Sequence, residues 1–207
     1  MAERGWLIAF EGIEGAGKST QIRLTAAALR ARGVGVVQTL EPGGTAFGVE
    51  ARRLLMHTPE SAPTPLAELF LYLADRAQHV SQIIAPALAD NQVVLTDRFS
   101  ASTIAYQAYA RGLDRETVTR LDAIARQGVA PALSVLLDCP VEVGLARARG
   151  DDRFHREEQQ FHQRVRRGFL SLARGGGDRY CVIDATAPQE QVQEQILAAV
   201  MQCLNPR

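Results

Sequence analysis

The stretch Gly12-Ile13-Glu14-Gly15-Ala16-Gly17-Lys18-Ser19 fits the phosphate-binding pattern G-x-x-x-x-G-K-[ST] at every fixed position. The apolar run Trp6-Leu7-Ile8-Ala9-Phe10 before it indicates a buried strand, and Ile22, Ala26 and Leu29 after it have helical spacing. When a glycine-rich loop joins a strand to a helix in this way, the backbone N–H groups of the loop and the N-terminus of the helix face the same anion. We therefore predict that this segment binds the phosphates of a nucleoside triphosphate.

The length and composition of the chain favour one folded domain. At 207 residues the chain suits a single α/β domain, since domains take about 100–200 residues. Lys plus Arg and Asp plus Glu are 23 each, so the net charge of zero suggests no nucleic acid and no membrane surface as a partner. No apolar stretch reaches the ~20 residues of a membrane span. Met1-Ala2-Glu3-Arg4 leads directly into the first strand without a signal peptide, so we expect a cytoplasmic protein.

The cysteines and histidines show no metal-ligand spacing. We interpret the cysteines as buried thiols in a reducing compartment and the histidines as surface or packing residues. These residues are Cys139, Cys181, Cys203, His57, His79, His155 and His162.

Apolar strands alternate with helices along the whole chain. After the first strand, further strands are predicted at 35–40, 93–97, 134–138 and 180–184. Helices are predicted at about 46–57, from 66 onward, after Ser100 in a helix that carries Tyr106, and at about 114–128, 140–149, 156–173 and 189–204. Ser100 and Asp114 are expected to cap two of these helices. The pattern predicts a five-stranded parallel sheet with helices on both faces. Ligands of such sheets lie beyond the carboxyl ends of the strands, where Glu41-Pro42-Gly43-Gly44-Thr45 and Asp97-Arg98 are placed.

The acids at the strand ends favour group transfer over hydrolysis. Many ATPases follow the strand-terminal Asp with a Glu that polarises water, but here Asp97 precedes Arg98 and Asp138 precedes Cys139. The N-K-x-D signature of GTP switches is also absent. A phosphomonoester acceptor needs no such base, because its second pKa near 6 makes it anionic at pH 7. Its transfer reaction needs positioning and neutralised charge.

Arginines supply that charge. Arg98 follows a buried strand end, and a second group flanks the break at 150–152. Arginine binds phosphate bidentately, so a mobile segment of this kind could close over the transferring group. A solvated helical face explains the same group equally well, because acids lie among the arginines. The group consists of Arg147, Arg149, Arg153 and Arg156.

Tyr72 and Arg76 lie four residues apart on the predicted long helix, so they share a face that is off its apolar stripe. A ring and a guanidinium together could hold a planar base. The spacing by itself favours the plainer interpretation, an ordinary tyrosine and a surface arginine.

Together these residues resemble the bacterial thymidylate kinases, P-loop nucleoside monophosphate kinases that transfer the γ-phosphate of ATP to dTMP in dTTP synthesis. The matching segments occur in family order over nearly the whole chain. They are 10–20, 41–45, 75–78, Asp97-Arg98-Phe99, Ser102-Thr103, Ala105-Tyr106-Gln107, Arg111-Gly112, 143–148, Asp152-Arg153-Phe154 and 183–186.

The resemblance implies a P-loop NTPase fold in which residues 1–207 form a single kinase domain with a short arginine-bearing lid at about 147–157. It also implies Mg²⁺ with ATP as co-substrate, and a homodimer joined through helices that include the long one. The alternatives are another nucleoside monophosphate or small-molecule kinase on the same fold, and a non-catalytic P-loop protein that binds nucleotide and signals.

For ATP, the resemblance implies that Lys18 and the loop backbone hold the phosphates and that Arg147 lies beside the adenine. Ser19 and Asp97 are expected at the metal. The residues expected to bind ATP are Gly12, Ile13, Glu14, Gly15, Ala16, Gly17, Lys18, Ser19, Thr20 and Arg147. The residues expected to be catalytic are Lys18, Asp97, Arg98, Arg149 and Arg153.

For dTMP, the resemblance implies that Tyr72 stacks on thymine, Arg76 reads a thymine carbonyl and Arg98 binds the phosphate. Glu14 is expected to approach the sugar 3′-hydroxyl, and Tyr106 to lie under the deoxyribose. The full set expected to bind dTMP is Glu14, Pro42, Tyr72, Arg76, Arg98, Ser102, Thr103, Tyr106 and Gln107.

The chain departs from the family pattern at several positions. Leu40 stands where many relatives have arginine, and Tyr72 where they have phenylalanine. Ala108-Tyr109-Ala110 replaces a run of glycines, and the lid around 150–152 is short.

Overall fold

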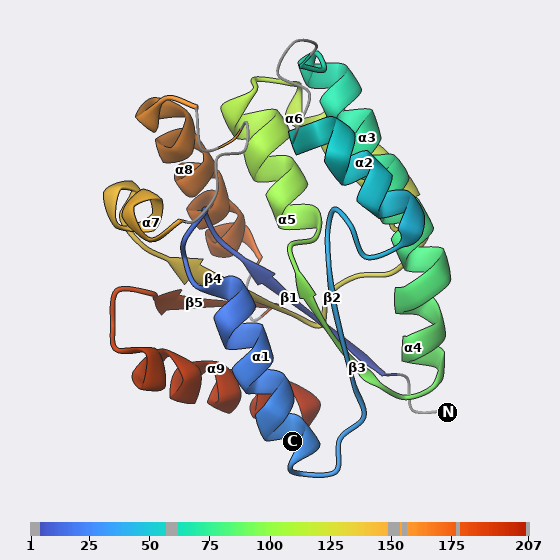
Figure 1. The fold of residues 1–207 in the computed structure, drawn as a ribbon, viewed down its shortest axis with the longest axis vertical. Coiled ribbons are helices and arrows are strands. Elements are labelled where there is room, and N and C mark those ends of the chain that lie inside the picture. The colour runs from blue at the N-terminus through green and yellow to red at the C-terminus, as the bar shows by residue number, and fades with distance from the viewer. Residues whose placement is uncertain (1–4, 57–61, 149–153, 155–156, 177–178, 206–207) are drawn as a thin grey trace.

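The computed structural model describes residues 5–56, 62–148, 154, 157–176 and 179–205 (Figure 1). Its centre is a five-stranded sheet in the order β2-β3-β1-β4-β5, in which every neighbouring pair is parallel. The strands are β1 (Trp6–Glu11), β2 (Val36–Leu40), β3 (Val93–Asp97), β4 (Leu133–Asp138) and β5 (Tyr180–Asp184). The predicted parallel α/β fold is therefore confirmed.

Helices cover both faces of the sheet. α1 and α9 lie together on one face, as Figure 1 shows, and the helices between β2 and β5 lie largely on the other. The α-helices are α1 (Lys18–Arg30), α2 (Ala46–Met56), α3 (Pro65–His79), α4 (Ala85–Ala89), α5 (Ser100–Thr103), α6 (Arg115–Ala125), α7 (Val141–Arg147), α8 (Gln159–Gly175) and α9 (Gln189–Leu204), and two π-helical segments are η2 (Val80–Ile84) and η3 (Ile104–Ala110).

Burial on both faces explains the continuous apolar character of β1. Ile8 and Phe10 belong to the core cluster that contains the apolar residues of α1, whereas Leu7 and Ala9 pack with η2 and α4. All of these strand residues are 0–2% exposed. A strand buried on both faces has no polar alternation, as is typical of parallel sheets.

The register of the sheet brings distant segments to one edge. Phe10 of β1 and Leu40 of β2 both pair with Asp97 of β3. On the other side of β1, Glu11 pairs with Leu136 of β4. The phosphate-binding loop, the loop after Leu40 and Arg98 therefore begin side by side at the carboxyl edge of the sheet.

The predicted long helix from residue 66 is interrupted. α3 ends at His79, the turn Val80–Ile84 is π-helical, and α4 follows. Pro86 in the first turn of α4 has no N–H to complete the α-helical ladder, and a π-turn is a common way to accommodate such a break. The apolar stripe continues across the turn, since Val80 and Ile84 are buried.

The predicted capping by Ser100 is wrong, whereas that by Asp114 is confirmed. Phe99 occupies the N-cap of α5, and the Ser100 hydroxyl instead donates a hydrogen bond to Asp122 at 3.1 Å. The Asp114 carboxylate accepts from the Thr117 N–H at 2.7 Å. Ser100 points to Asp122 because α6 packs against α5, a contact that local sequence does not reveal.

Cys139 is buried, as predicted. Cys181 in β5 and Cys203 in α9 are only half-buried. In the part of the chain that the structure describes, no helix is both long enough and apolar enough for a membrane span.

Candidate active site

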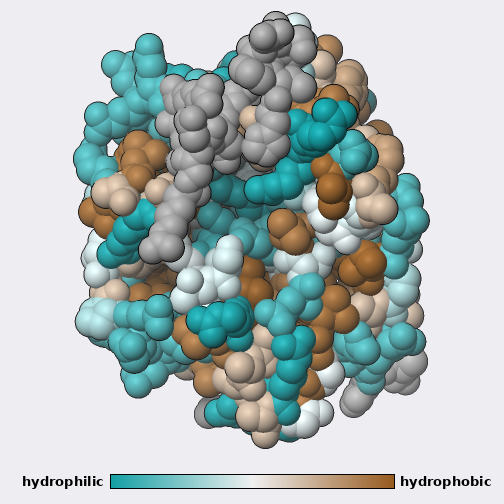
Figure 2. Space-filling view, viewed as in Figure 1, coloured by the Kyte–Doolittle hydropathy of each residue, from teal (hydrophilic) through white to brown (hydrophobic). Residues whose placement is uncertain are grey.

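A pocket of about 910 Å³ opens at the carboxyl edge of the sheet, near the middle of the face in Figure 2. Its volume lies at the upper end of the range for small-molecule sites. It is bordered by the phosphate-binding loop, by the loop after β2, by α3, by η3 and by the segment after α7. This is the edge at which ligands of open α/β sheets bind.

Most of the predicted site residues meet in this pocket. Those that line it are Glu14, Gly15, Ala16, Gly17, Lys18, Ser19, Thr20, Pro42, Tyr72, Arg76, Asp97, Arg98, Ser102, Thr103, Tyr106, Gln107 and Arg147. Gly12 and Ile13 contribute through their backbone carbonyls, which contact Lys18. Arg149 and Arg153 lie outside the described residues, as do Arg156 and the segment 150–152.

The pocket is also lined by residues that were not predicted as site residues. Glu41 belongs to the predicted loop 41–45, but no role was predicted for its carboxylate. Arg52, Met56, Phe154, Ala185 and Gln189 also line the pocket. Glu41, Phe154 and Ala185 lie in segments that match the family, which could have marked them, whereas only the fold reveals that Arg52, Met56 and Gln189 line the pocket.

The phosphate-binding loop is preformed. Gly12, Gly15 and Gly17 have φ of 141°, 69° and 94°, the region that glycine adopts without strain. The Lys18 ammonium donates to the carbonyls of Gly12 and Ile13 at 3.1 and 2.9 Å, so it closes the loop from within. Burial, with the nearby charge of Arg98, lowers the pKa of Lys18 to about 8. The loop therefore concentrates positive charge and backbone donors for phosphate oxygens.

Gly144 of α7 supports this loop from behind. A Cβ at Gly144 would lie 2.6 Å from the backbone carbonyl of Glu14 and 2.7 Å from the Ile13 side chain. We expect Gly144→Ala to displace the loop and to weaken ATP binding about tenfold, because overpacking of this size costs ~1–3 kcal/mol. Titration with ATP would measure the change. The control is Gly175→Ala near the end of α8, where a Cβ meets nothing within 4 Å. Equal ATP affinities for the two variants would contradict the prediction.

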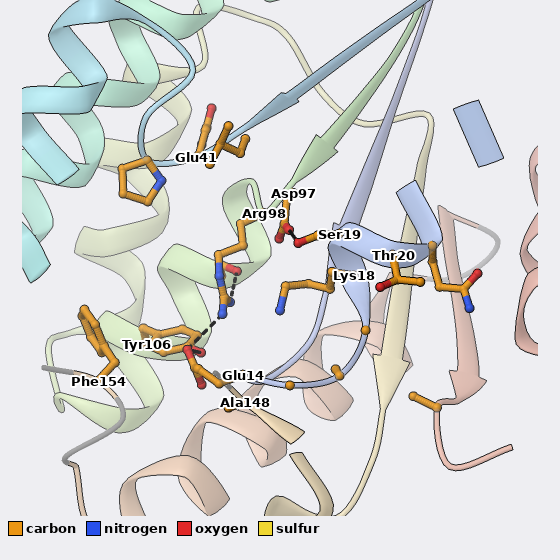
Figure 3. A pocket seen from close by; sticks show the side chains of 18 of the residues that line it. Glu14, Lys18, Ser19, Thr20, Glu41, Asp97, Arg98, Tyr106, Ala148 and Phe154 are labelled. Carbon is orange, nitrogen blue, oxygen red and sulfur yellow. Dashed lines mark hydrogen bonds and ion pairs between the residues drawn. The ribbon is translucent and has the colours of Figure 1, made fainter. Parts of the chain in front are cut away.

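The side-chain oxygens of Ser19 and Asp97 lie side by side. The Ser19 hydroxyl donates to Asp97 Oδ2 at 2.6 Å beside Lys18 (Figure 3). Among the described residues, no group of three or more His, Cys, Asp or Glu side chains is placed to hold a metal. Mg²⁺ in nucleotide sites takes one or two protein oxygens and completes its shell with water and phosphate, so a hydroxyl–carboxylate pair fits this ion.

Arg98 and Glu14 form an ion pair across the pocket floor. Arg98 Nη2 lies 2.9 Å from Glu14 Oε1, and its guanidinium lies over the Tyr106 ring, 5.0 Å from the centroid (Figure 3). Tyr106 also donates to Glu14 Oε1 at 2.5 Å. Burial opposes ionisation of Glu14, but the charge of Arg98 outweighs it and holds the pKa of this carboxyl well below its usual range. Both groups are therefore charged in the free protein.

Arg98 is held firmly at this position. Its Nη1 donates to the carbonyl of Gly12 and to the Ser102 hydroxyl, both at 3.1 Å. Its backbone N–H donates to the carbonyl of Phe10, and its φ of 73° turns the chain sharply after β3. The turn directs the guanidinium into the pocket, where an anion could replace Glu14.

Glu11, at the end of β1, is a buried acid next to this pair. It accepts hydrogen bonds from the Phe99 N–H at 3.0 Å and the Ser102 hydroxyl at 2.6 Å. Burial raises the pKa of the Glu11 carboxyl to about 7, although these hydrogen bonds and the charge of Arg98 act in the opposite direction.

This shift predicts a loss of stability as pH rises. The unfolded chain releases the Glu11 proton near pH 4.5 and the folded protein only near pH 7, so the unfolded state binds fewer protons between these values. We expect Glu11 to contribute a decline of up to about 3 kcal/mol over this range. Thermal unfolding from about pH 5 to about pH 8 should therefore fall more steeply for the wild type than for Glu11→Gln. Parallel curves would contradict this assignment.

Arg76 is buried, so its interpretation as a surface residue is wrong. The side chain is 2% exposed and lies between two carboxylates, Glu41 at 2.7 Å and Asp122 at 2.5 Å. Its Nη1 also donates to the Thr103 hydroxyl at 2.8 Å. Tyr72, one turn earlier, is half-buried and lines the same pocket. The helical spacing placed both residues on one face, but a second layer of protein covers that face.

His79 and His162 are buried packing residues, and His79 also bonds to a carboxylate. Both are 0% exposed. The ring of His79 bridges Glu41 Oε1 at 2.8 Å and the Thr39 hydroxyl at 2.6 Å, so it fixes the carboxylate that holds Arg76. His162 lies beside Glu14, with 3.4 Å between Nδ1 and Oε2. His57 and His155 lie outside the described residues.

An aromatic cluster joins Tyr106 to the base of the predicted lid. The Tyr106 ring meets Phe154, Phe161 and Phe169 edge-on, with centroids 5.7–6.2 Å apart. Arg111 lies over Phe161 at 4.5 Å. Residues that follow the segment 149–153 are therefore tied to Tyr106 in the pocket.

Further predicted residues are held in place by buried partners. Gln107 donates to Glu68 Oε1 at 2.9 Å. Arg147, at the end of α7, donates to the carbonyl of Ala185 at 2.8 Å. Gln107 therefore lies at the α3 side of the pocket and Arg147 at the α9 side, so different elements line the two ends of the pocket.

The chain is similar to proteins of one family. The family model for thymidylate kinase matches residues 10–196. A thymidylate kinase of Geobacter sulfurreducens is 51% identical over 189 residues, which covers 87% of this chain and 89% of that protein. Thymidylate kinases of Trichlorobacter lovleyi and Desulfovibrio desulfuricans are each 47% identical, over 94% and 97% of this chain and 96% and 97% of those proteins.

Proposed function

The chain belongs to the thymidylate kinase family, and we propose on this basis that it transfers the γ-phosphate of ATP to dTMP, giving ADP and dTDP for dTTP synthesis. The observation that carries the proposal is that one pocket brings together the phosphate-binding loop, Arg98 and Arg76. One end offers donors for a triphosphate. The other offers a buried guanidinium, two aromatic rings and a second arginine for a nucleoside monophosphate.

We place ATP on the phosphate-binding loop. The backbone from Gly12 to Thr20 would enclose the phosphates, and Lys18 would exchange the carbonyls of Gly12 and Ile13 for phosphate oxygens. Arg147 lies at the α9 side of the pocket, where an adenine would extend from the loop. Because Lys18 is buried, its charge acts on the phosphates with little screening.

We propose Ser19 and Asp97 as the protein ligands of Mg²⁺. Their oxygens are already in contact and face the loop. When bound, the metal would supply positive charge that offsets the charge of the β- and γ-phosphates.

We place dTMP between Tyr72, Arg76 and Arg98. Within the described residues, the contacts of Arg76 with Glu41, Asp122 and Thr103 leave an Nη2 hydrogen free to donate to a base carbonyl. The Tyr72 ring would stack on thymine. This orients the acceptor so that its phosphate reaches Arg98.

The remaining walls would read the sugar and the edge of the base. The buried Tyr106 ring leaves little room beside C2′, and the Glu14 carboxylate would accept from the 3′-hydroxyl. Pro42, Ser102, Thr103 and Gln107 complete the wall. In this arrangement, a 2′-deoxynucleotide fits better than a ribonucleotide.

Transfer would proceed by alignment and electrostatics without a covalent enzyme intermediate. The acceptor phosphate is itself the nucleophile, so no general base is required. Arg98 would hold it in line with the γ-phosphate, and Arg149 and Arg153 remain predicted lid residues within a single domain of residues 1–207.

We also propose a cytoplasmic homodimer joined through α2, α3 and α6. These helices pack in the order α2, α3, α6 and carry exposed apolar side chains. They are Phe47, Leu66, Phe70 and Ile124, each 49–73% exposed. Apolar side chains gathered on neighbouring helices are typical of an interface.

An acceptor panel tests the proposed reaction. ADP release from MgATP is measured with dTMP, dUMP, dCMP, UMP, AMP or shikimate, and without acceptor. We expect strong stimulation by dTMP and weaker stimulation by dUMP, which lacks the thymine methyl group. Stimulation by a different acceptor would support another kinase on this fold, and ATP binding without any stimulation would support a signalling role.

A further inference from the structure

His162, in the first turn of α8, is an anomaly in the core. It is 0% exposed, and within the described part of the chain neither ring nitrogen has a hydrogen-bond partner. Buried polar groups almost always have partners, because leaving them unpaired is costly. A leucine or phenylalanine would pack here without that cost. The histidine therefore calls for an explanation other than packing.

A carboxylate oxygen beside His162 is also unpaired among the described residues. Glu14 Oε2 lies 3.4 Å from His162 Nδ1, and it too is buried without a hydrogen-bond partner among the described residues. The other oxygen of the same carboxylate, Oε1, accepts from both Arg98 and Tyr106. The Glu14 carboxylate therefore directs Oε1 into the pocket and Oε2 toward α8.

Binding of a phosphate at Arg98 would disturb this carboxylate. In the proposed function, on which this inference rests, Arg98 binds the acceptor phosphate. The guanidinium then has to share or leave Glu14 Oε1, because a phosphate dianion is a strong bidentate partner of arginine. Glu14 is only 11% exposed, so it would keep its charge with little compensation from water.

We propose that His162 is a positioning residue that receives Glu14 when Arg98 turns to the acceptor phosphate. Its Nδ1–H donates to Glu14 Oε2, so the loop carboxylate stays in place for the sugar hydroxyl while the arginine is released. An N–H···O bond has a length of about 2.7–3.2 Å, so a movement of a few tenths of an ångström completes it. In the free protein the two atoms are 3.4 Å apart and do not form this bond, while Arg98 bonds to the other oxygen of the carboxylate.

The surroundings of His162 suit this exchange. Its ring meets Phe161 edge-on at 5.6 Å, and Phe161 in turn meets Tyr106. These aromatic contacts hold the His162 ring in place, and they therefore fix the direction in which Nδ1 points. α8 also follows directly on the predicted lid, so His162 would tie the position of this helix to occupancy of the acceptor site.

A pair of variants of equal size tests the proposal. His162→Asn keeps an amide near the position of Nδ1, and His162→Leu has a similar shape without a donor. We expect the KM for dTMP to rise about tenfold in the leucine variant and to stay within about threefold of wild type in the asparagine variant. The KM for ATP should change little in both. The thermal midpoint of the leucine variant should equal or exceed that of the asparagine variant, because no buried polar group is left in it.

The double variant with Glu14→Gln shows whether the two side chains are coupled. The proposal expects His162→Leu to change the KM for dTMP less than about twofold in this background. Equal dTMP KM values for the leucine variant and the wild type would overturn the proposal, as would equal losses in the leucine and asparagine variants. A wild type without dTMP turnover would overturn the proposed function itself and this inference with it, an outcome visible before any variant is made.

Discussion

Arg98→Met is expected to lower kcat/KM for dTMP about 10²–10³-fold while ATP still binds. Arg98 is a partly buried cation beside the phosphate-binding loop, and its hydrogen bonds to Gly12 and Ser102 fix its direction. Methionine fills a similar volume without charge or donors. The acceptor phosphate would then lose both its anchor and its alignment with the γ-phosphate. Steady-state kinetics with dTMP and titration with ATP measure the two effects.

Two controls separate this loss from misfolding. Arg98 also neutralises Glu14, so the thermal midpoint of the variant is measured alongside its activity. Arg32→Met removes an exposed arginine in the turn after α1, whose side chain donates to the carbonyl of Ala28, and it should retain wild-type kinetics. Near-normal turnover of Arg98→Met would remove this residue from the mechanism.

The second large effect concerns stability. Arg76→Met is expected to lower the free energy of unfolding by about 3–5 kcal/mol, because it leaves Glu41 and Asp122 as buried carboxylates without their shared cation. Both carboxylates are 2% exposed in side-chain area. For a chain of this size each kcal/mol lowers the melting temperature by about 2–4 °C, so a fall of roughly 6–20 °C should be seen in thermal unfolding.

Charge, rather than lost packing, is the expected cause. Adding Glu41→Gln and Asp122→Asn to Arg76→Met removes the unpaired charges, and much of the stability should return. Arg126→Met is the matched single control, since Arg126 also contacts Asp122 but is 24% exposed and leaves Arg76 in place. It should cost far less. If Arg76→Met and Arg126→Met melted together, the buried pairing would not govern stability.

Arg76 shows what a local sequence pattern cannot predict. Helical spacing correctly placed Tyr72 and Arg76 on one face of α3, off the apolar stripe. An off-stripe face usually meets water, so the pattern favoured a surface arginine. The partners of Arg76 are 35 and 46 residues away in the chain, on the loop after β2 and on α6. No local pattern contains that information.

Predictions that depended only on residues close together in the sequence were more accurate. The Asp114 cap needs only an acid placed before a helix, and the strand at residues 180–184 and the last helix at 189–204 were predicted with the bounds observed. The Ser100 cap failed because Asp122, far along the chain, competes for its hydroxyl. The lid arginines Arg149 and Arg153 stay predictions.

The sequence by itself determined the parallel α/β sheet and the phosphate-binding loop, because apolar runs, helical spacing and glycines at 12, 15 and 17 act over a few residues. The resemblance then named the substrates. Tertiary structure alone decided how the charges are shared: Glu14 lies between Arg98 and His162, and Arg76 between two acids. The energy of a buried charge depends on which groups the fold brings within a few ångströms, wherever they stand in the chain.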